Sequence, residues 1–159
     1  MAIVHSHMVR MLNCIYIQAP NVHEPKDISD FLTFIHAWLM LLHEHHGNEE
    51  TLFFPWIEEY IGIPGYMAPN IEQHHAFEPG SQELDKYVVD CREGREKFDG
   101  LKVRAIIDRF GEVLSQHLAD EIIFLEGLGK FDDKIDWGTL NKRIQKHAVS
   151  TADTVSYLL

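Results

Sequence analysis

A histidine followed four residues later by a glutamate recurs along this chain, in stretches that are otherwise rich in apolar residues. The pairs are His45/Glu49, His46/Glu50, His74/Glu78 and His117/Glu121. With 11 His and 14 Glu among 159 residues, random placement would give such a pair roughly once. Because residues four apart are neighbours on one face of an α-helix, the recurrence predicts helices that carry paired imidazoles and carboxylates.

Apolar residues recur at spacings of three and four throughout the chain, which predicts an all-α fold. The predicted helices run over residues 2–18, from a cap at Asp27 or Ser29 to about residue 60, from a cap at Asn70 to about residue 92, from a cap at Asp99 to about residue 128, and over 137–159. Four long helices with short loops predict an antiparallel up-down-up-down four-helix bundle with an extra C-terminal helix on its outside. We expect a single domain, 1–159, with the bundle at about 2–128 and the helical extension at about 136–159.

The expected inner face of the second helix is apolar except at His45 and Glu49, and continues through Leu52 and Trp56, with a kink at Pro55. The fourth helix and the starts of the first and third helices each place a histidine on a comparable stripe. The candidate metal ligands are His5, His45, Glu49, His74, Glu78, His117 and Glu121. Antiparallel helices can bring these side chains to one level. Seven ligands suit two ions, with carboxylates spanning between them.

Each pair taken alone also fits a buried hydrogen bond, and a single histidine on an apolar face is more often a packed core residue. Several buried carboxylates together would suffer a large desolvation penalty unless a positive charge neutralised them. The predicted stripes contain no Lys or Arg, so a cation is the remaining candidate. A metal-free helical bundle is the alternative. His46 and Glu50 lie one step round the helix and are interpreted as a supporting pair or a solvated flank.

The net charge of −11 disfavours nucleic acid and anionic membranes as partners. The longest apolar stretch is too short to span a bilayer, and the first residues do not resemble a signal peptide. Two distant cysteines, Cys14 and Cys91, favour a reducing compartment. We therefore expect a cytoplasmic protein. The His43-Glu44 segment lacks the second histidine of a zincin helix, and the ferritin-like Glu-x-x-His pattern appears only at Glu72/His75.

Several motifs in order resemble the hemerythrin-like (HHE cation-binding) domain, and the likeness covers roughly residues 2–128. They are His5-Ser6-His7-Met8-Val9-Arg10, His45-His46-Gly47-Asn48-Glu49-Glu50 with Phe54-Pro55, Gln73-His74, and His117-Leu118-Ala119-Asp120-Glu121. The resemblance implies a non-haem di-iron centre in a four-helix bundle. It implies that His5 and His45 hold one iron, that His74 and His117 hold the other, and that Glu49 and Glu121 bridge. The donor types also suit manganese and zinc.

The chain departs from the oxygen-carrying hemerythrins at Glu78, because those proteins have a histidine four residues after the third-helix histidine. A third anionic ligand favours higher-valent iron, and a Glu78 turned away by Pro79 would leave an open position. Both outcomes favour an oxidoreductase that activates O2 and oxidises a small organic molecule, with Glu49, Glu121 and Glu78 as candidate catalytic residues. The alternative is a non-catalytic protein that binds, stores or senses O2 or iron. A pocket beside the irons would favour the enzyme, and a sealed site would favour the binder.

Overall fold

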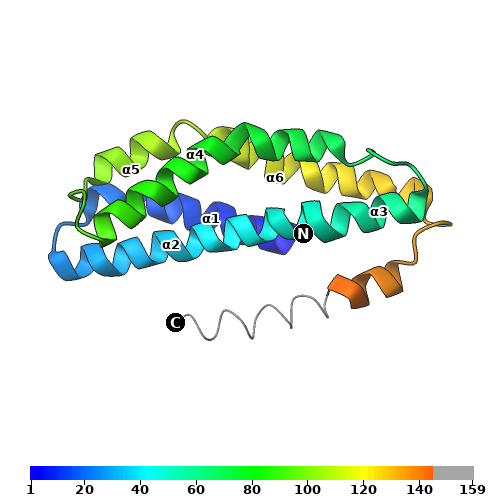
Figure 1. Ribbon diagram of the computed structural model, residues 1–159, viewed down its shortest axis with the longest axis horizontal. Helices are drawn as coiled ribbons and strands as arrows, with labels where there is room; N and C mark the ends of the chain where they lie inside the picture. Colours follow the sequence, from blue (N-terminus) through cyan, green and yellow to red (C-terminus); the bar gives the residue numbers. More distant parts are fainter. Residues whose placement is uncertain (145–159) are drawn as a thin grey trace.

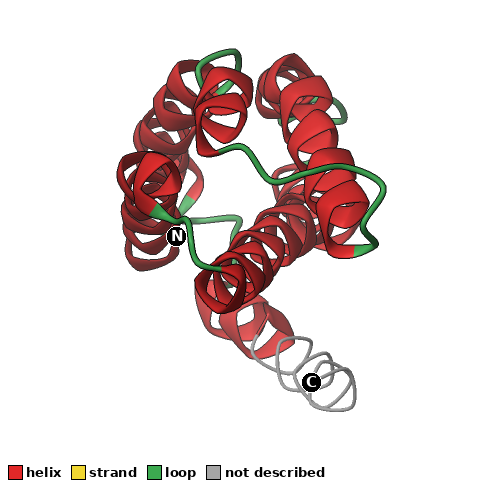
Figure 2. Cartoon of the chain, turned by 90° about the vertical axis from the view of Figure 1, so that its left-hand side faces the viewer, coloured by secondary structure: helices red, strands yellow, loops and turns green. Residues whose placement is uncertain are grey.

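A computed structural model of the chain, in which residues 1–144 are described, is a bundle of antiparallel helices (Figure 1). Its helices are α1 (Ala2–Gln18), α2 (Pro25–Asn48), α3 (Phe54–Ile61), α4 (Ala68–Arg92), α5 (Gly100–Ile107) and α6 (Gly111–Glu126). The view along the bundle shows the helices packed around a common axis (Figure 2). The described residues contain no strand, so the predicted all-α bundle is confirmed. None of the helices described is long and apolar enough to cross a membrane.

The second predicted helix is interrupted by a π-helical turn, Glu49–Phe53, between α2 and α3. The backbone N–H of Phe54 bonds to the carbonyl of Glu49, five residues back, and Pro55 has no N–H to continue an α-helical ladder. The extra residue in this turn changes the direction of the side chains that follow in α3. The buried positions of α3 are therefore Phe54, Ile57 and Ile61, whereas the uninterrupted stripe predicted Leu52 and Trp56.

The fourth predicted helix is divided into α5 and α6 by a turn at residues 108–110. Asp99 caps α5 as predicted, because its Oδ1 accepts a hydrogen bond from the Leu101 N–H at 2.8 Å. Phe110 ends the turn and packs directly on α4 at Gly80, where a Cβ atom would lie 2.5 Å from the Cβ of Phe110. The glycine thus admits an aromatic side chain against the helix backbone.

Helix α4 starts at Ala68, two residues before the predicted cap at Asn70, and runs through Pro79 without ending. Asn70 is buried inside the first turn rather than preceding the helix. Pro69 occupies the start of the helix, where the absence of an N–H has no cost.

Two apolar clusters fill the bundle, one on either side of a polar layer. The larger includes Met8, Trp38, Leu84, Phe110 and Leu118. The smaller, at the α3 end, consists of Phe54, Ile57, Ile61, Met67, Leu128, Ile135 and Leu140. His45, Glu49, His74 and Glu121 fall in sequence between residues of the two clusters.

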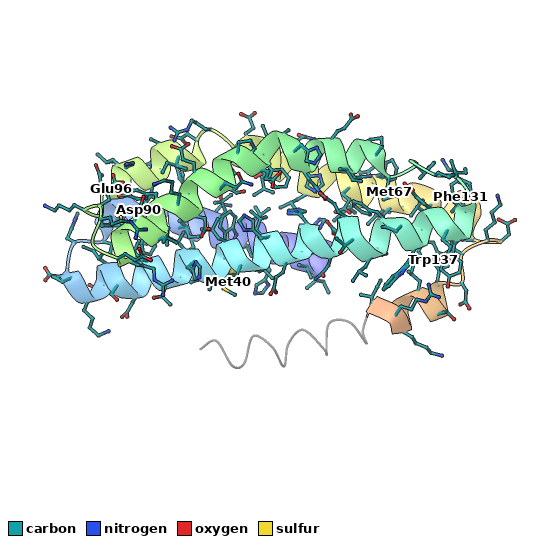
Figure 3. The ribbon with its side chains drawn as sticks, viewed as in Figure 1. Met40, Met67, Asp90, Glu96, Phe131 and Trp137 are labelled. Carbon is teal, nitrogen blue, oxygen red and sulfur yellow. The ribbon has the colours of Figure 1, made fainter. Side chains whose placement is uncertain are left out.

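The segment after α6 lies at the α3 end of the bundle, where Met67, Phe131 and Trp137 are labelled in Figure 3. Residues 137–144 are helical, and Ile135 and Leu140 are buried in the smaller apolar cluster. This part of the predicted C-terminal extension therefore packs on the outside of the bundle. The remainder of the extension predicted at 136–159, residues 145–159, lies outside the described residues.

Candidate metal centre

Seven side chains from four helices form two adjoining groups in the middle of the bundle. The first group, called the histidine-rich set, is His46, Glu49, His74 and His117. The second, called the acid-rich set, is His5, His45, Glu49 and Glu121. In each set the candidate ligand atoms lie within 4.8 Å of one another. Both sets contain Glu49, so one carboxylate faces two neighbouring sites.

The position of Glu49 follows from helix geometry. Glu49 comes four residues after His45 and three after His46, so its side chain lies between those of the two histidines on the helix surface. Its Oε1 is 2.9 Å from Nε2 of His45, and its Oε2 is 3.6 Å from Nε2 of His74. One oxygen thus faces each set.

The acid-rich set brings α1 into the site. Nε2 of His5 lies 3.2 Å from Oε2 of Glu121 and 2.9 Å from Nε2 of His45. The other ring nitrogen of His5, Nδ1, lies 2.8 Å from the carbonyl of Leu118, and only an N–H can donate to that oxygen. In the neutral ring the proton is therefore on Nδ1, and Nε2 of His5 is unprotonated with its lone pair facing the site.

The layer is dry, and its inward atoms lack aligned hydrogen bonds. Glu49 is 2% exposed and Glu121 is 0% exposed, while the most accessible side chain of the seven, His45, is 11% exposed. Among the described residues, both oxygens of Glu49, both of Glu121, and Nε2 of His46, His74 and His117 make no hydrogen bond of acceptable geometry, although histidine nitrogens lie close to the carboxylates. Buried polar atoms are normally paired. Nitrogen and oxygen lone pairs that converge in this way fit a pair of bound cations.

Burial dominates the ionisation of the layer. It raises the pKa of Glu49 to about 9, and the nearby charge of Glu121 adds to the effect. Burial lowers the pKa of His45 to about 4 and that of His117 to about 4. The pKa values of His46 and His74 are also lowered by burial.

His5 behaves differently from the other four histidines. Burial again lowers its pKa, but the contacts with Glu121 and the Leu118 carbonyl outweigh that effect and raise the value above 6.5. At neutral pH four of the five imidazoles are therefore in the neutral form that binds metals.

Two phenylalanines flank the histidine-rich set. The Phe54 ring stacks on His74 with centroids 5.8 Å apart, and Phe77 lies 5.5 Å from His117. These rings come from the two apolar clusters on either side of the layer. Such a surrounding lowers the local dielectric and excludes water from the site.

Six of the seven predicted site residues are brought together, and Glu78 is not. The buried positions of α4 run from His74 to Phe77 and then Ser81, a spacing of three and then four. Glu78 falls beside that stripe and is exposed. Its Oε1 accepts a hydrogen bond from Nε2 of Gln82 at 2.9 Å, so the prediction that Glu78 faces the site was wrong.

His46 takes part instead, although the sequence interpretation placed it behind the ligands or on a solvated flank. Leu39, Leu42, His46 and Glu49 are buried along α2 at alternating spacings of three and four, a pattern that was present in the sequence. The donor set is thus five imidazoles and two carboxylates, rather than four and three. Glu50 contacts Nδ1 of His74 from outside the set, which agrees with the supporting role that was one of the two interpretations of the His46/Glu50 pair.

The fold and this layer together define a helical-bundle protein with a buried His/Glu cluster that could bind metal cations. Residues 1–123 match the model of the hemerythrin HHE cation-binding domain, and the chain belongs to that family, as its motifs predicted. It is 31% identical over 144 residues to "dimeric xanthone biosynthesis cluster protein R11" of Cryptosporiopsis sp. (strain 8999). The alignment covers 91% of this chain and 54% of that relative, so the chain spans about half of the relative's length. No solved structure matches.

Proposed function

We propose that this chain is a non-haem di-iron protein that binds O2 in the buried layer between its two apolar clusters. The observation that carries the proposal is the pair of buried carboxylates, Glu49 and Glu121, whose oxygens have no aligned hydrogen bonds. Among the described residues, the side chains within 4 Å that could pair with these carboxylates are histidines, and burial keeps most of those imidazoles neutral. Two iron ions, when bound, would supply the electrons that O2 accepts.

The protein's own residues would hold, separate and shield the ions. His46, His74 and His117 would hold one ion, and His5 and His45 the other, with Glu49 shared between them. Glu121 belongs to the acid-rich set, where its oxygen faces His5. This assignment keeps the bridging role expected of Glu49. Phe54 and Phe77 would keep water from the histidine-rich side.

Two observations favour O2 or iron binding over the oxidation of an organic molecule. Glu78 is exposed, so a third carboxylate no longer favours higher-valent iron. Apart from His45, the side chains of the site are also buried, and a cleft of about 780 Å³ lies elsewhere, lined by Pro20, Phe98 and their neighbours. That cleft is at the far end of the bundle (Glu96 in Figure 3), about 20 Å along α1 from His5.

An oxidoreductase acting on a small organic molecule is the second candidate. It is favoured by the similarity to a protein named for a xanthone biosynthesis cluster. Because the site is buried, the organic molecule would have to approach it at His45, the most accessible side chain of the seven.

The proposal also depends on which metal is bound. Manganese or zinc in place of iron would leave cation binding intact but would not support the proposed O2 binding.

Iron loading followed by O2 cycling tests both functions. The full chain is loaded anaerobically with Fe(II), and we expect two iron ions per chain. O2 uptake is then followed with an oxygen electrode and by absorbance, and the O2 is removed under argon. Binding predicts uptake that repeats over several cycles. An oxidoreductase predicts O2 consumption that grows with an added organic reductant.

The control for this experiment is His46→Ala, which removes one imidazole from the histidine-rich set and leaves the acid-rich set complete. We expect it to hold fewer than two iron ions and to lose reversible uptake. Absence of iron from the loaded wild-type protein would rule out both functions.

A further inference from the structure

Three imidazoles of the layer are held from behind by three chemically different acceptors. The outer nitrogen of His5 bonds to a backbone carbonyl, that of His117 lies 3.0 Å from the amide oxygen of Gln73, and that of His74 lies 2.7 Å from Oε1 of Glu50. Each bond fixes the ring and leaves Nε2 facing the site. His74 and His117 belong to the same set, so one candidate ion has a charged acceptor behind one imidazole and a neutral acceptor behind the other.

The two acceptors are themselves held differently. Gln73 is oriented by Asp120, whose Oδ2 accepts from the Gln73 amide at 3.4 Å, and Gln116 donates to the other Asp120 oxygen at 2.7 Å. This chain of contacts fixes which end of the Gln73 amide faces His117. Glu50 has 33% of its side chain exposed and is not one of the seven site residues. It therefore adds a negative charge at the edge of the layer without occupying a coordination position.

A carboxylate that accepts a hydrogen bond from a ligating imidazole makes that imidazole a stronger donor than an amide does. We propose that Glu50 and Gln73 are positioning residues that give His74 and His117 unequal donor strength, so that Glu50 lowers the reduction potential of the ion in the histidine-rich set. This inference rests on the proposed di-iron function. It assigns a role to two residues that are not ligands and that the family match does not identify.

The test exchanges the two acceptors between charged and neutral forms of nearly the same shape. Glu50→Gln keeps an acceptor oxygen and removes the charge, whereas Gln73→Glu adds a charge behind the other imidazole. The midpoint potential of the iron-loaded full chain is measured by spectroelectrochemistry. Glu50→Gln should raise the potential and Gln73→Glu should lower it, each by about 59 mV for every tenfold change in the ratio of ferric to ferrous affinity.

Glu78→Gln is the matched control, because it removes the same charge from an exposed glutamate that does not contact the site. We expect the potential to stay unchanged in this variant. Glu50→Ala separates position from charge, since it removes the acceptor altogether. It should also weaken Co(II) binding, measured by absorbance titration, by about 10- to 100-fold.

Each result decides the inference. Opposite shifts in Glu50→Gln and Gln73→Glu, with no shift in Glu78→Gln, support it. Equal potentials in all variants, or shifts in the same direction, overturn it while leaving the di-iron proposal in place. Wild-type protein that fails to bind two Co(II) and two iron ions per chain overturns both proposals, because then no ion exists for Glu50 to influence.

Discussion

The apolar layer around Trp38 and the His/Glu layer around Glu49 differ in whether their buried polar atoms find hydrogen-bond partners within the protein. Around Trp38 the side chain is satisfied within the protein, because its indole N–H donates to the Met8 carbonyl at 3.1 Å and its ring packs near Phe110. Further along α2, the layer around Glu49 is equally buried but contains carboxylate oxygens without aligned partners. The first layer stabilises the bundle, and the second holds buried carboxylates that must either keep a proton, as the raised pKa of Glu49 indicates, or be neutralised by a bound cation.

The largest effect that separates the two layers is expected from Glu49→Gln, which removes the carboxylate shared by both sets. A ligand that binds only the folded state adds about 4 kcal/mol to the free energy of unfolding at 1,000 times its Kd. Two bound ions would contribute this twice in the wild type. Metal analysis and urea unfolding with and without metal should show that Glu49→Gln loses most of this gain.

The same measurements on Glu78→Gln provide the comparison, since this glutamate lies outside the layer. If Glu49→Gln still binds two ions with the metal-dependent stability of the wild type, the shared carboxylate has no role in cation binding.

Trp38→Ala should produce the reverse result. The side chain is fully buried, and truncating such an aromatic residue costs about 3–5 kcal/mol through lost burial and the cavity left behind. The variant should unfold at lower urea concentration with or without metal. It should still bind two ions, because the His/Glu layer lies on other turns of the helices. Loss of metal from a folded Trp38→Ala protein would mean that the two layers are not separable.

The metal-free protein should show a pH dependence that only the polar layer can cause. The histidines with lowered pKa values bind fewer protons when folded than when unfolded, so stability rises as the pH increases from about 4 to 6.5. The pKa of Glu49 is raised from 4.5 to about 9, so its contribution to stability falls as the pH increases from 4.5 towards 9. Above pH 6.5 the gain from the four histidines is complete, and the net stability should therefore fall. One proton gives a slope of at most about 1.4 kcal/mol per pH unit.

Urea unfolding between pH 4 and pH 9 would measure this curve, with a maximum expected near pH 6.5. In Glu49→Gln the descending side should become shallower, because the amide does not ionise and His5, whose pKa is also raised, still holds an extra proton in the folded state. Bound metal should also remove it, since the ion stabilises the deprotonated carboxylate. A metal-free wild type whose stability is flat from pH 6.5 to 9 would contradict the assigned burial of Glu49.

The apolar layers and most of the polar layer could be predicted from the sequence because both follow one helical period. His5, His45, His74 and His117 each interrupt an apolar stripe, and that signal is local. The sequence could not predict which residues are buried after an irregular turn interrupts a helix. The π-helical turn after Glu49 shifts the buried face by one residue, and nothing in the local pattern besides Pro55 indicates it.

The choice between neighbouring residues also depended on tertiary contacts. On α4 both Phe77 and Glu78 lie near the direction of His74, and the structure buries Phe77 and exposes Glu78; Gly80, two residues later, packs against Phe110. On α2 both His45 and His46 face inward because two sets of ligands lie side by side. A pattern-based interpretation assigns one residue per turn to the interior, so it predicted one histidine there instead of two.

The smallest expected effect tests whether Glu78 lies outside the polar layer. Glu78→Gln should change the free energy of unfolding by no more than about 0.5 kcal/mol, the usual limit for surface substitutions, because the amide can still accept the hydrogen bond from Gln82. Iron content should remain at two ions per chain. The matched variant is His46→Ala on α2. It should reduce the iron content, although the sequence analysis assigned His46 a supporting role. If Glu78→Gln loses iron and His46→Ala does not, Glu78 belongs to the polar layer, which would then contain three carboxylates and would not include His46 as a ligand.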